Sequence, residues 1–377
     1  MSEKKRMANL ELLRCVAMMM VIVLHYLGKG RLLADLTDSS PESFDSVGAA
    51  AWFLEAFCIV AVNVYMLISG YFLCTSSFKL SRLLQLLMQV WLYSVVFGIL
   101  GAATGIIKET PVDIHYFLTL MFPVSMEHYW FLTAYVFLYL ILPFTGAAVK
   151  RMTKRQMQIA LALLLITFCV LKSILPLRLE KDTKGYDCLW YLCVFLTAAY
   201  IRRFGVVFLE KRRRAACLYV VCCLLAFTGT MALRFVFVRT GSLGRMTGMC
   251  MEYNHIFPFL AAIGLFGAFA QTAIKGKIAR VINTIAPYTL GVYLLHENLG
   301  LRYTWQNWFG ADRVSNVGEL LLWTLLAVLG VFVIGILVDM LRAGLMKGIH
   351  GLLCRLKVYR KLVGKIENAD SLFREAS

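Results

Sequence analysis

Three side chains in the first long apolar stretch have types and spacing suited to proton transfer and phosphate binding. Arg14 and His25 are eleven residues apart, and Glu11 precedes Arg14 by three. On a helix, eleven residues return a side chain to within about 20° of the same stripe, about 16 Å along the axis. Glu11 and Arg14 have the spacing of a helical ion pair. An imidazole is the usual base for a hydroxyl and a guanidinium suits phosphates, so the stretch predicts one helix carrying both.

Structural roles would also explain these residues. Arg14 could anchor the helix at a membrane interface, and His25 could be a hydrogen-bonded core residue. An arginine at the centre of a bilayer costs about 2.5–3.5 kcal/mol on insertion scales, so such residues usually face protein or a water-filled cavity. Because the two side chains share one stripe, we favour a polar path over two unrelated roles.

The composition indicates which class of protein must position these groups. Of 377 residues, 60% are hydrophobic and 16% are charged, which is typical of an all-α, polytopic membrane protein. The net charge of +17 lies largely in short loops between apolar stretches, where it sets membrane orientation, so we expect no nucleic-acid binding. No small-residue cleavage site follows the basic N-terminus, and we expect the first stretch to be retained.

About ten apolar stretches are expected to cross the membrane, although the sixth and ninth are short enough to require tilt or an earlier start. The run 115–124 is too short to cross and suits a re-entrant or interfacial helix. The predicted crossings are 9–27, 49–73, 83–105, 128–147, 156–175, 189–201, 215–238, 253–273, 284–299 and 317–341.

The loops alternate between basic ones and ones that hold most of the loop acids. The positive-inside rule then places the basic loops and both chain ends, the N- and C-termini, in the cytoplasm. Residues 343–366 mix aliphatic and basic side chains, which predicts an amphipathic helix on the inner leaflet. We therefore divide the chain into a membrane-embedded domain, 1–341, and a basic cytoplasmic tail, 342–377.

The eleven cysteines are scattered, mostly in apolar stretches, and lack the spacing of metal ligands. We treat them as small hydrophobic residues and expect no metal site. A disulfide between Cys188 and Cys250 would require both to lie near the outer face.

Further candidate residues lie near the end of the second predicted crossing, 49–73, and just before the third, 83–105. Gly70 would allow close helix packing, and Ser69 would bond to its own helix. Lys79 and Arg82 satisfy the positive-inside rule, and could also hold ligand phosphates.

Two aromatic residues and a second histidine complete the candidate site residues. Tyr129 and Trp130 begin the fourth crossing, where an aromatic belt is expected, and His296 ends the ninth. These residues alone indicate a polar path around His25, and do not separate an enzyme from a transporter.

Four motifs, in this order, resemble the acyltransferase-3 family of membrane acyltransferases, whose members modify cell-surface glycans and other extracytoplasmic acceptors. They are the Arg14-to-His25 spacing of the first helix and the stretches 65–72, 129–132 and 291–296. Two features depart from the pattern. Lysine replaces the first arginine of the family's Arg-x-x-Arg motif, and lysine lacks the bidentate fork of arginine. No esterase-like extracytoplasmic domain follows, so any such partner would be a separate protein.

The resemblance implies transfer of a short acyl group, acetyl by expectation, from cytoplasmic acyl-coenzyme A (acyl-CoA) to a hydroxyl near the outer side. Arg14, with Lys79 and Arg82, would hold the donor, which is a substrate and not a permanently bound cofactor. His25 would be the general base or a transient acyl carrier, and Glu11 would orient Arg14.

On the acceptor side, the resemblance implies contacts from Ser69, Tyr129, Trp130 and His296 to a polysaccharide or lipid-linked glycan. The expected location is a bacterial plasma membrane, with the lipid bilayer as the surrounding partner. The competing interpretations are a transporter or flippase for a lipid-linked sugar, without covalent chemistry, and a membrane sensor or scaffold that would tolerate loss of Arg14.

Overall fold

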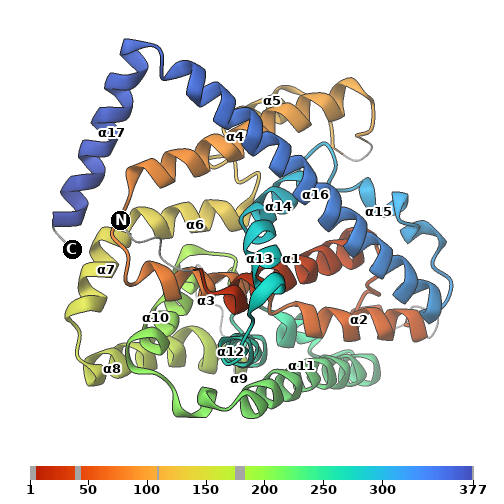
Figure 1. The fold of residues 1–377 in the computed structure, drawn as a ribbon. Coiled ribbons are helices and arrows are strands. Elements are labelled where there is room, and N and C mark those ends of the chain that lie inside the picture. The colour runs from red at the N-terminus through yellow and green to blue at the C-terminus, as the bar shows by residue number, and fades with distance from the viewer. Residues whose placement is uncertain (1–5, 39–43, 108–109, 175–182, 376–377) are drawn as a thin grey trace. The chain divides into compact units, whose positions relative to one another are not determined.

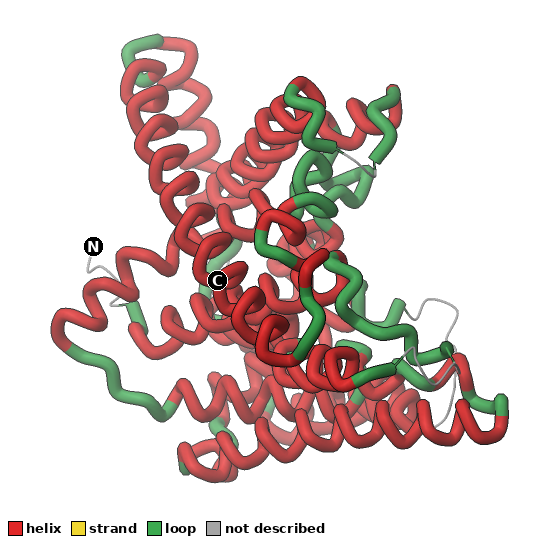
Figure 2. The backbone as a smooth tube through the Cα atoms, turned by 90° about the vertical axis from the view of Figure 1, so that its right-hand side faces the viewer, coloured by secondary structure: helices red, strands yellow, loops and turns green. Residues whose placement is uncertain are grey.

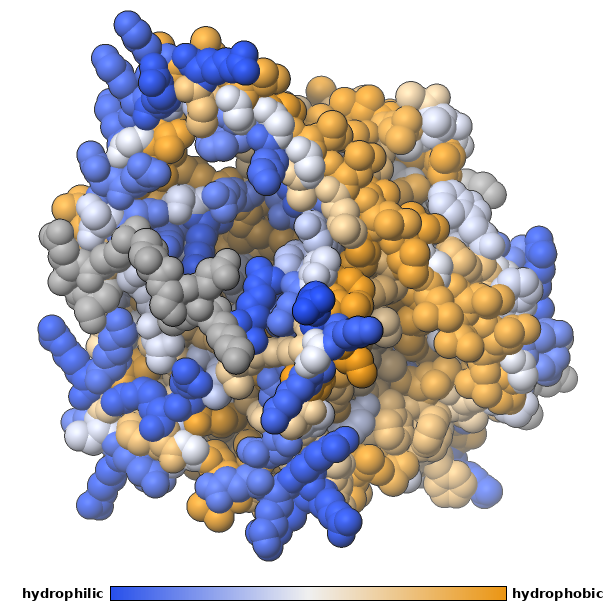
Figure 3. All heavy atoms as spheres, viewed as in Figure 1, coloured by the Kyte–Doolittle hydropathy of each residue, from blue (hydrophilic) through white to orange (hydrophobic). Residues whose placement is uncertain are grey.

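The structure is a computed structural model that describes residues 6–38, 44–107, 110–174 and 183–375 (Figure 1). Helices and loops make up all of these residues, with no strand among them (Figure 2). Among the described residues, eight helical segments are long and apolar enough to cross a membrane, and a bent pair adds a ninth. The prediction of an all-α, polytopic membrane protein is therefore confirmed. The exposed surface is rich in apolar side chains, as a bilayer requires (Figure 3).

The described helices form two compact units. Unit 1 comprises the chain up to Tyr71, Thr153–Pro287 and Trp305–Gly330. In it, helix α1 (Ala8–Lys29) packs against α2, α12 and α13, and α11 packs along α12. Its other elements are α2 (Ser46–Cys58), α3 (Ala61–Leu73), α8 (Lys154–Leu165), α9 (Leu171–Ile174), α10 (Cys188–Phe204), α11 (Arg212–Thr240), α12 (Ile256–Ala270), α13 (Gly276–Ile285) and α15 (Trp305–Trp308).

Unit 2 comprises Phe72–Met152, Tyr288–Thr304 and the chain from Val331 onward. Helix α4 (Leu80–Ala103) is its centre and packs against α5, α14 and α17. The remaining elements are α5 (Ile114–Met121), α6 (Trp130–Leu140), α7 (Leu142–Arg151), α14 (Thr289–His296), the second part of α16 (Val317–Leu353) and α17 (Lys357–Glu375).

Side chains at helix starts explain several of these boundaries. Asp45, Asp113 and Asp187 each accept a backbone hydrogen bond at the start of α2, α5 and α10. Thr153 and Gln156 form a reciprocal capping box at the start of α8. Such caps satisfy N–H groups that have no partner within the helix, so each helix begins where its cap allows.

Several predicted crossings are interrupted. The stretch 128–147 is α6 and α7, which bend by 59° where Pro143 opens α7, because proline cannot continue the preceding hydrogen-bond ladder. The stretch 49–73 is divided between α2 and α3. A π-helical turn, Ile166–Val170, separates α8 from α9. Cys188 and Cys250 are both free, so the disulfide considered for them is not formed.

The tail also differs from its prediction. Helix α16 continues to Leu353, well past residue 341, and α17 begins at Lys357. The expected single amphipathic helix over 343–366 is therefore wrong, because the apolar helix of 317–341 runs on into it. The boundary between 1–341 and 342–377 stays a prediction.

Gly70 brings α3 and α10 together within unit 1. A Cβ atom at this position would lie 2.9 Å from the Cβ of Ala198 and 3.0 Å from the Cα of Phe195. We expect Gly70→Leu to lower the free energy of unfolding by about 1–3 kcal/mol, the usual cost of overpacking. Thermal denaturation in detergent would measure this. Gly344→Leu is the matched control, because no atom lies within 4 Å of its added Cβ; equal losses would contradict the packing argument.

Candidate functional site

Arg14 is held at two points in unit 1, its guanidinium and its backbone carbonyl. Its Nη1 donates to Glu11 Oε2 at 2.7 Å, so the ion pair that the spacing predicts is present. The hydroxyl of Tyr65, on α3, donates to the backbone carbonyl of Arg14 at 2.9 Å. The Arg14 side chain remains 28% exposed, whereas that of Glu11 is 9% exposed. The guanidinium is thus held by a nearly buried carboxylate, while part of the Arg14 side chain stays exposed.

The first turns of α1 are fixed to the ends of other helices. Asn9 Nδ2 donates to the carbonyls of Phe269 and Ala270, both at 3.0 Å. These carbonyls belong to the last turn of α12, where they have no partner within the helix. Arg6 Nη1 donates to the carbonyl of Asn283 at 3.1 Å. The end of α1 that carries Glu11 and Arg14 is therefore anchored to α12 and α13.

The other end of α1, near His25, is held by α15 and the residue after it. Tyr26 donates its hydroxyl to the carbonyl of Phe309 at 2.8 Å. Gln306 Nε2 lies 3.4 Å from the carbonyl of His25. His25 itself is half-buried. Both bonds are donated by side chains, those of Tyr26 and Gln306, to backbone carbonyls, so neither of these two bonds uses the imidazole.

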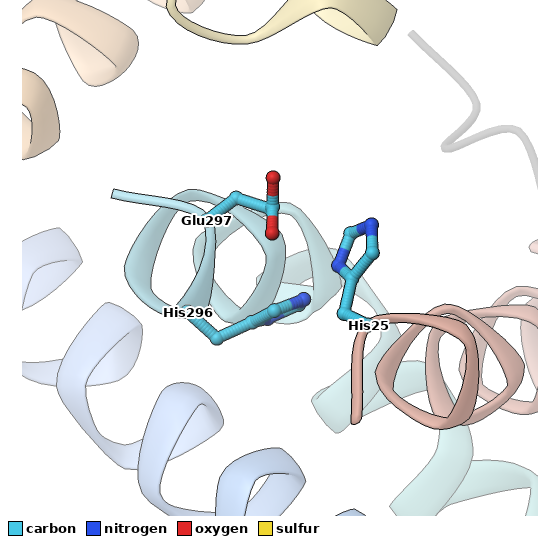
Figure 4. Close-up of side chains that lie close together, drawn as sticks. All are labelled: His25, His296 and Glu297. Atoms are coloured by element: carbon cyan, nitrogen blue, oxygen red, sulfur yellow. The ribbon is translucent and has the colours of Figure 1, made fainter. Parts of the chain in front are cut away.

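His296 in unit 2 has a defined tautomer. Its Nδ1 lies 2.6 Å from the carbonyl of Val292, one turn earlier on α14. A carbonyl can only accept, so Nδ1 carries a proton and the lone pair of the neutral ring is on Nε2. His296 and Glu297 come from the end of α14, and both are buried; His25 comes from α1 (Figure 4). The geometry gives His296 a basic nitrogen directed away from its own helix backbone.

His128, a buried residue that sequence reasoning did not select, uses both ring nitrogens within unit 2. Nε2 accepts from the backbone N–H of Leu299 at 3.0 Å, so Nδ1 bears the proton of the neutral ring and donates to Ser94 Oγ at 2.8 Å. The ring stacks on Tyr129 with centroids 3.9 Å apart. His128 therefore orders the chain after α14 and has no nitrogen lone pair to offer a substrate.

Tyr129 is joined to the same segment. Its hydroxyl donates to the carbonyl of Leu294 at 3.0 Å and accepts from Asn298 Nδ2 at 3.2 Å. Asn298 also binds the carbonyl of Tyr93 on α4 at 3.0 Å. Tyr129 is 1% exposed, whereas Trp130 is half-buried. The hydroxyl of Tyr129 thus holds α14 in place, and its predicted contact with substrate stays a prediction.

Arg302 fastens the loop that follows α14. Its guanidinium donates to the carbonyl of Glu297 from Nε at 3.1 Å and from Nη2 at 2.9 Å, and to the carbonyl of His128 at 2.6 Å. The carboxylate of Glu297 lies 3.8 Å from the same Nη2. Sequence analysis missed Arg302; its one visible signal is a cation placed soon after a polar His-Glu-Asn run.

The remaining predicted residues lie in separate places. Lys79 immediately precedes α4, and its backbone N–H and carbonyl both bind the hydroxyl of Tyr139 at 3.2 Å. Arg82 is exposed on the first turn of α4. Ser69 is half-buried on α3 in unit 1. The structure thus pairs Glu11 with Arg14 and places Lys79 beside Arg82, and it places Tyr129 and His296 in one unit.

Three comparisons with known proteins bear on this arrangement. A family model described as an acyltransferase domain, that of the acyltransferase-3 family, matches residues 7–339. A search of curated proteins and a search of solved structures each found no match. The matched region includes α1 and α14 and ends before α17.

Proposed function

The chain belongs to the acyltransferase-3 family, and from this premise we propose that it moves an acetyl group from acyl-CoA to a hydroxyl on the opposite side of the membrane. A polysaccharide or lipid-linked glycan is the acceptor in this proposal, and a bacterial plasma membrane is the location. The observation that carries the proposal is α1 itself, which presents an oriented, partly exposed Arg14 and a half-buried His25 on one anchored helix.

The donor would bind through its phosphates. Arg14 offers a guanidinium whose direction Glu11 fixes, and such a group binds phosphate oxygens in a bidentate manner. Lys79 and Arg82 offer two more cations on one short turn. Lysine contributes a point charge and lacks the planar guanidinium that donates two parallel hydrogen bonds. In this proposal Arg14 and Arg82 therefore supply the directional hydrogen bonds to the donor phosphates.

The transfer step needs one base. His25 takes the proton of the acceptor hydroxyl as the hydroxyl oxygen attacks the thioester carbonyl carbon. A carbon–oxygen bond forms and the carbon–sulfur bond breaks, and the departing thiolate takes the proton from the imidazolium to give free coenzyme A. In the alternative route a His25 ring nitrogen attacks the thioester carbonyl carbon and coenzyme A leaves as the thiolate. The acceptor hydroxyl oxygen then attacks the acyl group, the acyl–nitrogen bond breaks, and the hydroxyl proton goes to the thiolate.

The acceptor would be held by aromatic and polar side chains. Trp130 is half-buried, which leaves part of its indole face for stacking on a sugar ring. In this proposal Nε2 of the neutral His296 ring, whose Nδ1 binds the carbonyl of Val292, accepts a hydrogen bond from a sugar hydroxyl. We include Ser69 and Tyr129 in this role, with Tyr129 acting through the helix it holds.

The deciding experiment is an assay of the purified protein with radiolabelled acetyl-CoA and a membrane glycolipid extract. An acyltransferase consumes the donor, releases coenzyme A and transfers label to the extract. A transporter or flippase would move a lipid-linked sugar in vesicles without consuming acetyl-CoA, and that result would overturn the proposal.

Arg14→Lys tests the donor role specifically. We expect kcat/KM for acetyl-CoA to fall by about 10- to 100-fold, because a hydrogen bond to a charged group contributes about 1.5–3 kcal/mol and lysine cannot form the fork. Initial rates over a range of acetyl-CoA concentrations would measure this. Arg213→Lys makes the same change at an exposed position on α11 and should leave kcat/KM unchanged. Equal effects of the two changes would remove Arg14 from donor binding.

A further inference from the structure

Helix α17 lies beyond the region that the family model matches and still packs against α4 within unit 2. It is not among the helices that are long and apolar enough to cross a membrane. Hydrophilic side chains gather where α16 ends and α17 begins (Figure 3). Four cations near the start of this helix are exposed, namely Lys357, Arg360, Lys361 and Lys365. Its contact with α4 must therefore come from other residues.

Asp370 makes the polar part of that contact. Its carboxylate accepts from the backbone N–H of Ser81 at 3.2 Å and from the Ser81 hydroxyl at 2.5 Å. Ser81 lies in the first turn of α4, where backbone N–H groups have no partner within the helix and a negative charge is favourable. Asp370 is 4% exposed, so this carboxylate from the last helix caps α4 in place of a local residue.

The ionised state of Asp370 fits this contact. Burial by itself raises the pKa of the carboxyl group, but the Ser81 hydrogen bonds and the positive charge of Lys79 act in the opposite direction. Together they hold the pKa of Asp370 below its ordinary value, so the carboxylate stays charged at neutral pH.

An aromatic contact completes the attachment. The rings of Phe373 and Phe78 have centroids 4.8 Å apart, and Phe78 packs on Tyr139 of α6 at 5.2 Å. The hydroxyl of Tyr139 in turn binds both backbone groups of Lys79. The turn 78–82 is therefore held between α6 on one side and α17 on the other.

We infer that α17 positions the donor-binding cations Lys79 and Arg82, with Asp370 and Phe373 as the positioning residues. This inference rests on the proposed function, which assigns those cations to the donor phosphates. Without α17, the first turn of α4 loses its cap from Asp370 and Phe78 loses its contact with Phe373, so the two cations would sample more orientations. Donor binding would then include the free-energy cost of ordering these two side chains, a cost that the docked helix removes.

Asp370→Ala tests the inference through donor affinity. We expect KM for acetyl-CoA to rise several-fold while kcat changes by less than a factor of about two, since a looser turn affects binding and not the chemical step. Equilibrium binding of labelled acetyl-CoA should weaken by the same factor. Asp370→Asn, which keeps an oxygen acceptor for Ser81, should restore part of the affinity. Glu367→Ala is the matched control, because it removes an exposed acid one turn earlier on the same helix.

The outcomes separate the inference from the proposed function. If the unaltered protein binds no acetyl-CoA, the proposed function fails. If it binds the donor and Asp370→Ala binds it equally well, the positioning role fails and the proposed function stands. A lower KM in Asp370→Ala would also overturn the inference, since it would mean that the carboxylate competes with the donor. The double change Asp370→Ala and Phe373→Ala, made in the full chain, removes both contacts of α17 and should raise KM at least as much as Asp370→Ala alone; an unchanged KM would contradict the role of α17.

Discussion

Replacing His25 by alanine is expected to lower the rate of acyl transfer by about 10²- to 10⁴-fold, the usual contribution of a positioned general acid–base group. We expect the protein still to fold, because two anchors at this position, from the hydroxyl of Tyr26 and from Gln306 to a backbone carbonyl, do not use the imidazole. Transfer of label from acetyl-CoA to a glycolipid extract would measure the loss, and the thermal denaturation midpoint in detergent would report on folding.

His115→Ala is the matched control for this experiment. His115 is exposed on α5, so the same chemical change there should leave both rate and stability near their original values. Normal transfer by the His25 variant would exclude His25 from the mechanism. If the variant instead loses transfer and also denatures much earlier than the control, the histidine has a structural role. If it still exchanges label between acetyl-CoA and coenzyme A, an acyl-carrying role for His25 is excluded.

The sequence predicts the arrangement on α1 well because one helix contains all of it. The spacing of Glu11, Arg14 and His25 fixes their angular positions once the stretch is helical, and the structure forms the expected ion pair. The apolar stretches likewise predict most helices, since crossing length and composition are properties of short segments.

The supporting contacts could not be predicted in the same way. Tyr65 and Gln306 reach α1 from positions far along the chain, and no local pattern marks the partner of a backbone carbonyl. His128 illustrates the same limit, because its tautomer depends on the N–H of Leu299. From the sequence alone, the aromatic residues at the start of α6 suggest a belt at the membrane interface. In the structure, Tyr129 instead belongs to a buried hydrogen-bond network.

Breaks within the helices were also hard to predict. Pro143 bends the predicted crossing 128–147, although proline is tolerated in many membrane helices and therefore does not specify a bend. In the tail, a predicted break is absent. The change in composition after residue 341 predicts a new helix, but α16 continues without interruption to Leu353. The docking of α17 depends on Asp370 and Ser81, which no local pattern relates to each other.

An ion pair on α16 between a buried Asp339 and a partly exposed Arg342 gives the largest expected effect on stability. Asp339 is fully buried, and its carboxylate accepts from Arg342 Nε at 2.6 Å and from Arg342 Nη2 at 3.2 Å. It also accepts from the hydroxyl of Tyr93 at 2.9 Å and from Gln89 at 3.1 Å, both on α4. A Cβ at Gly291 would collide with this carboxylate, so α14 also approaches it closely. Asp339 therefore joins three helices of unit 2.

We expect Asp339→Ala to lower the free energy of unfolding by about 3–5 kcal/mol, because it leaves the Arg342 cation without its buried partner. Thermal denaturation in detergent would measure this, with Asp312→Ala, an exposed acid, as control. Adding Arg342→Met should recover much of the loss, since an apolar side chain of similar length needs no counter-charge. If the double variant is as unstable as Asp339→Ala alone, the loss comes from the donors on α4. In that case Asp339 stabilises unit 2 through Tyr93 and Gln89, and the ion pair contributes little.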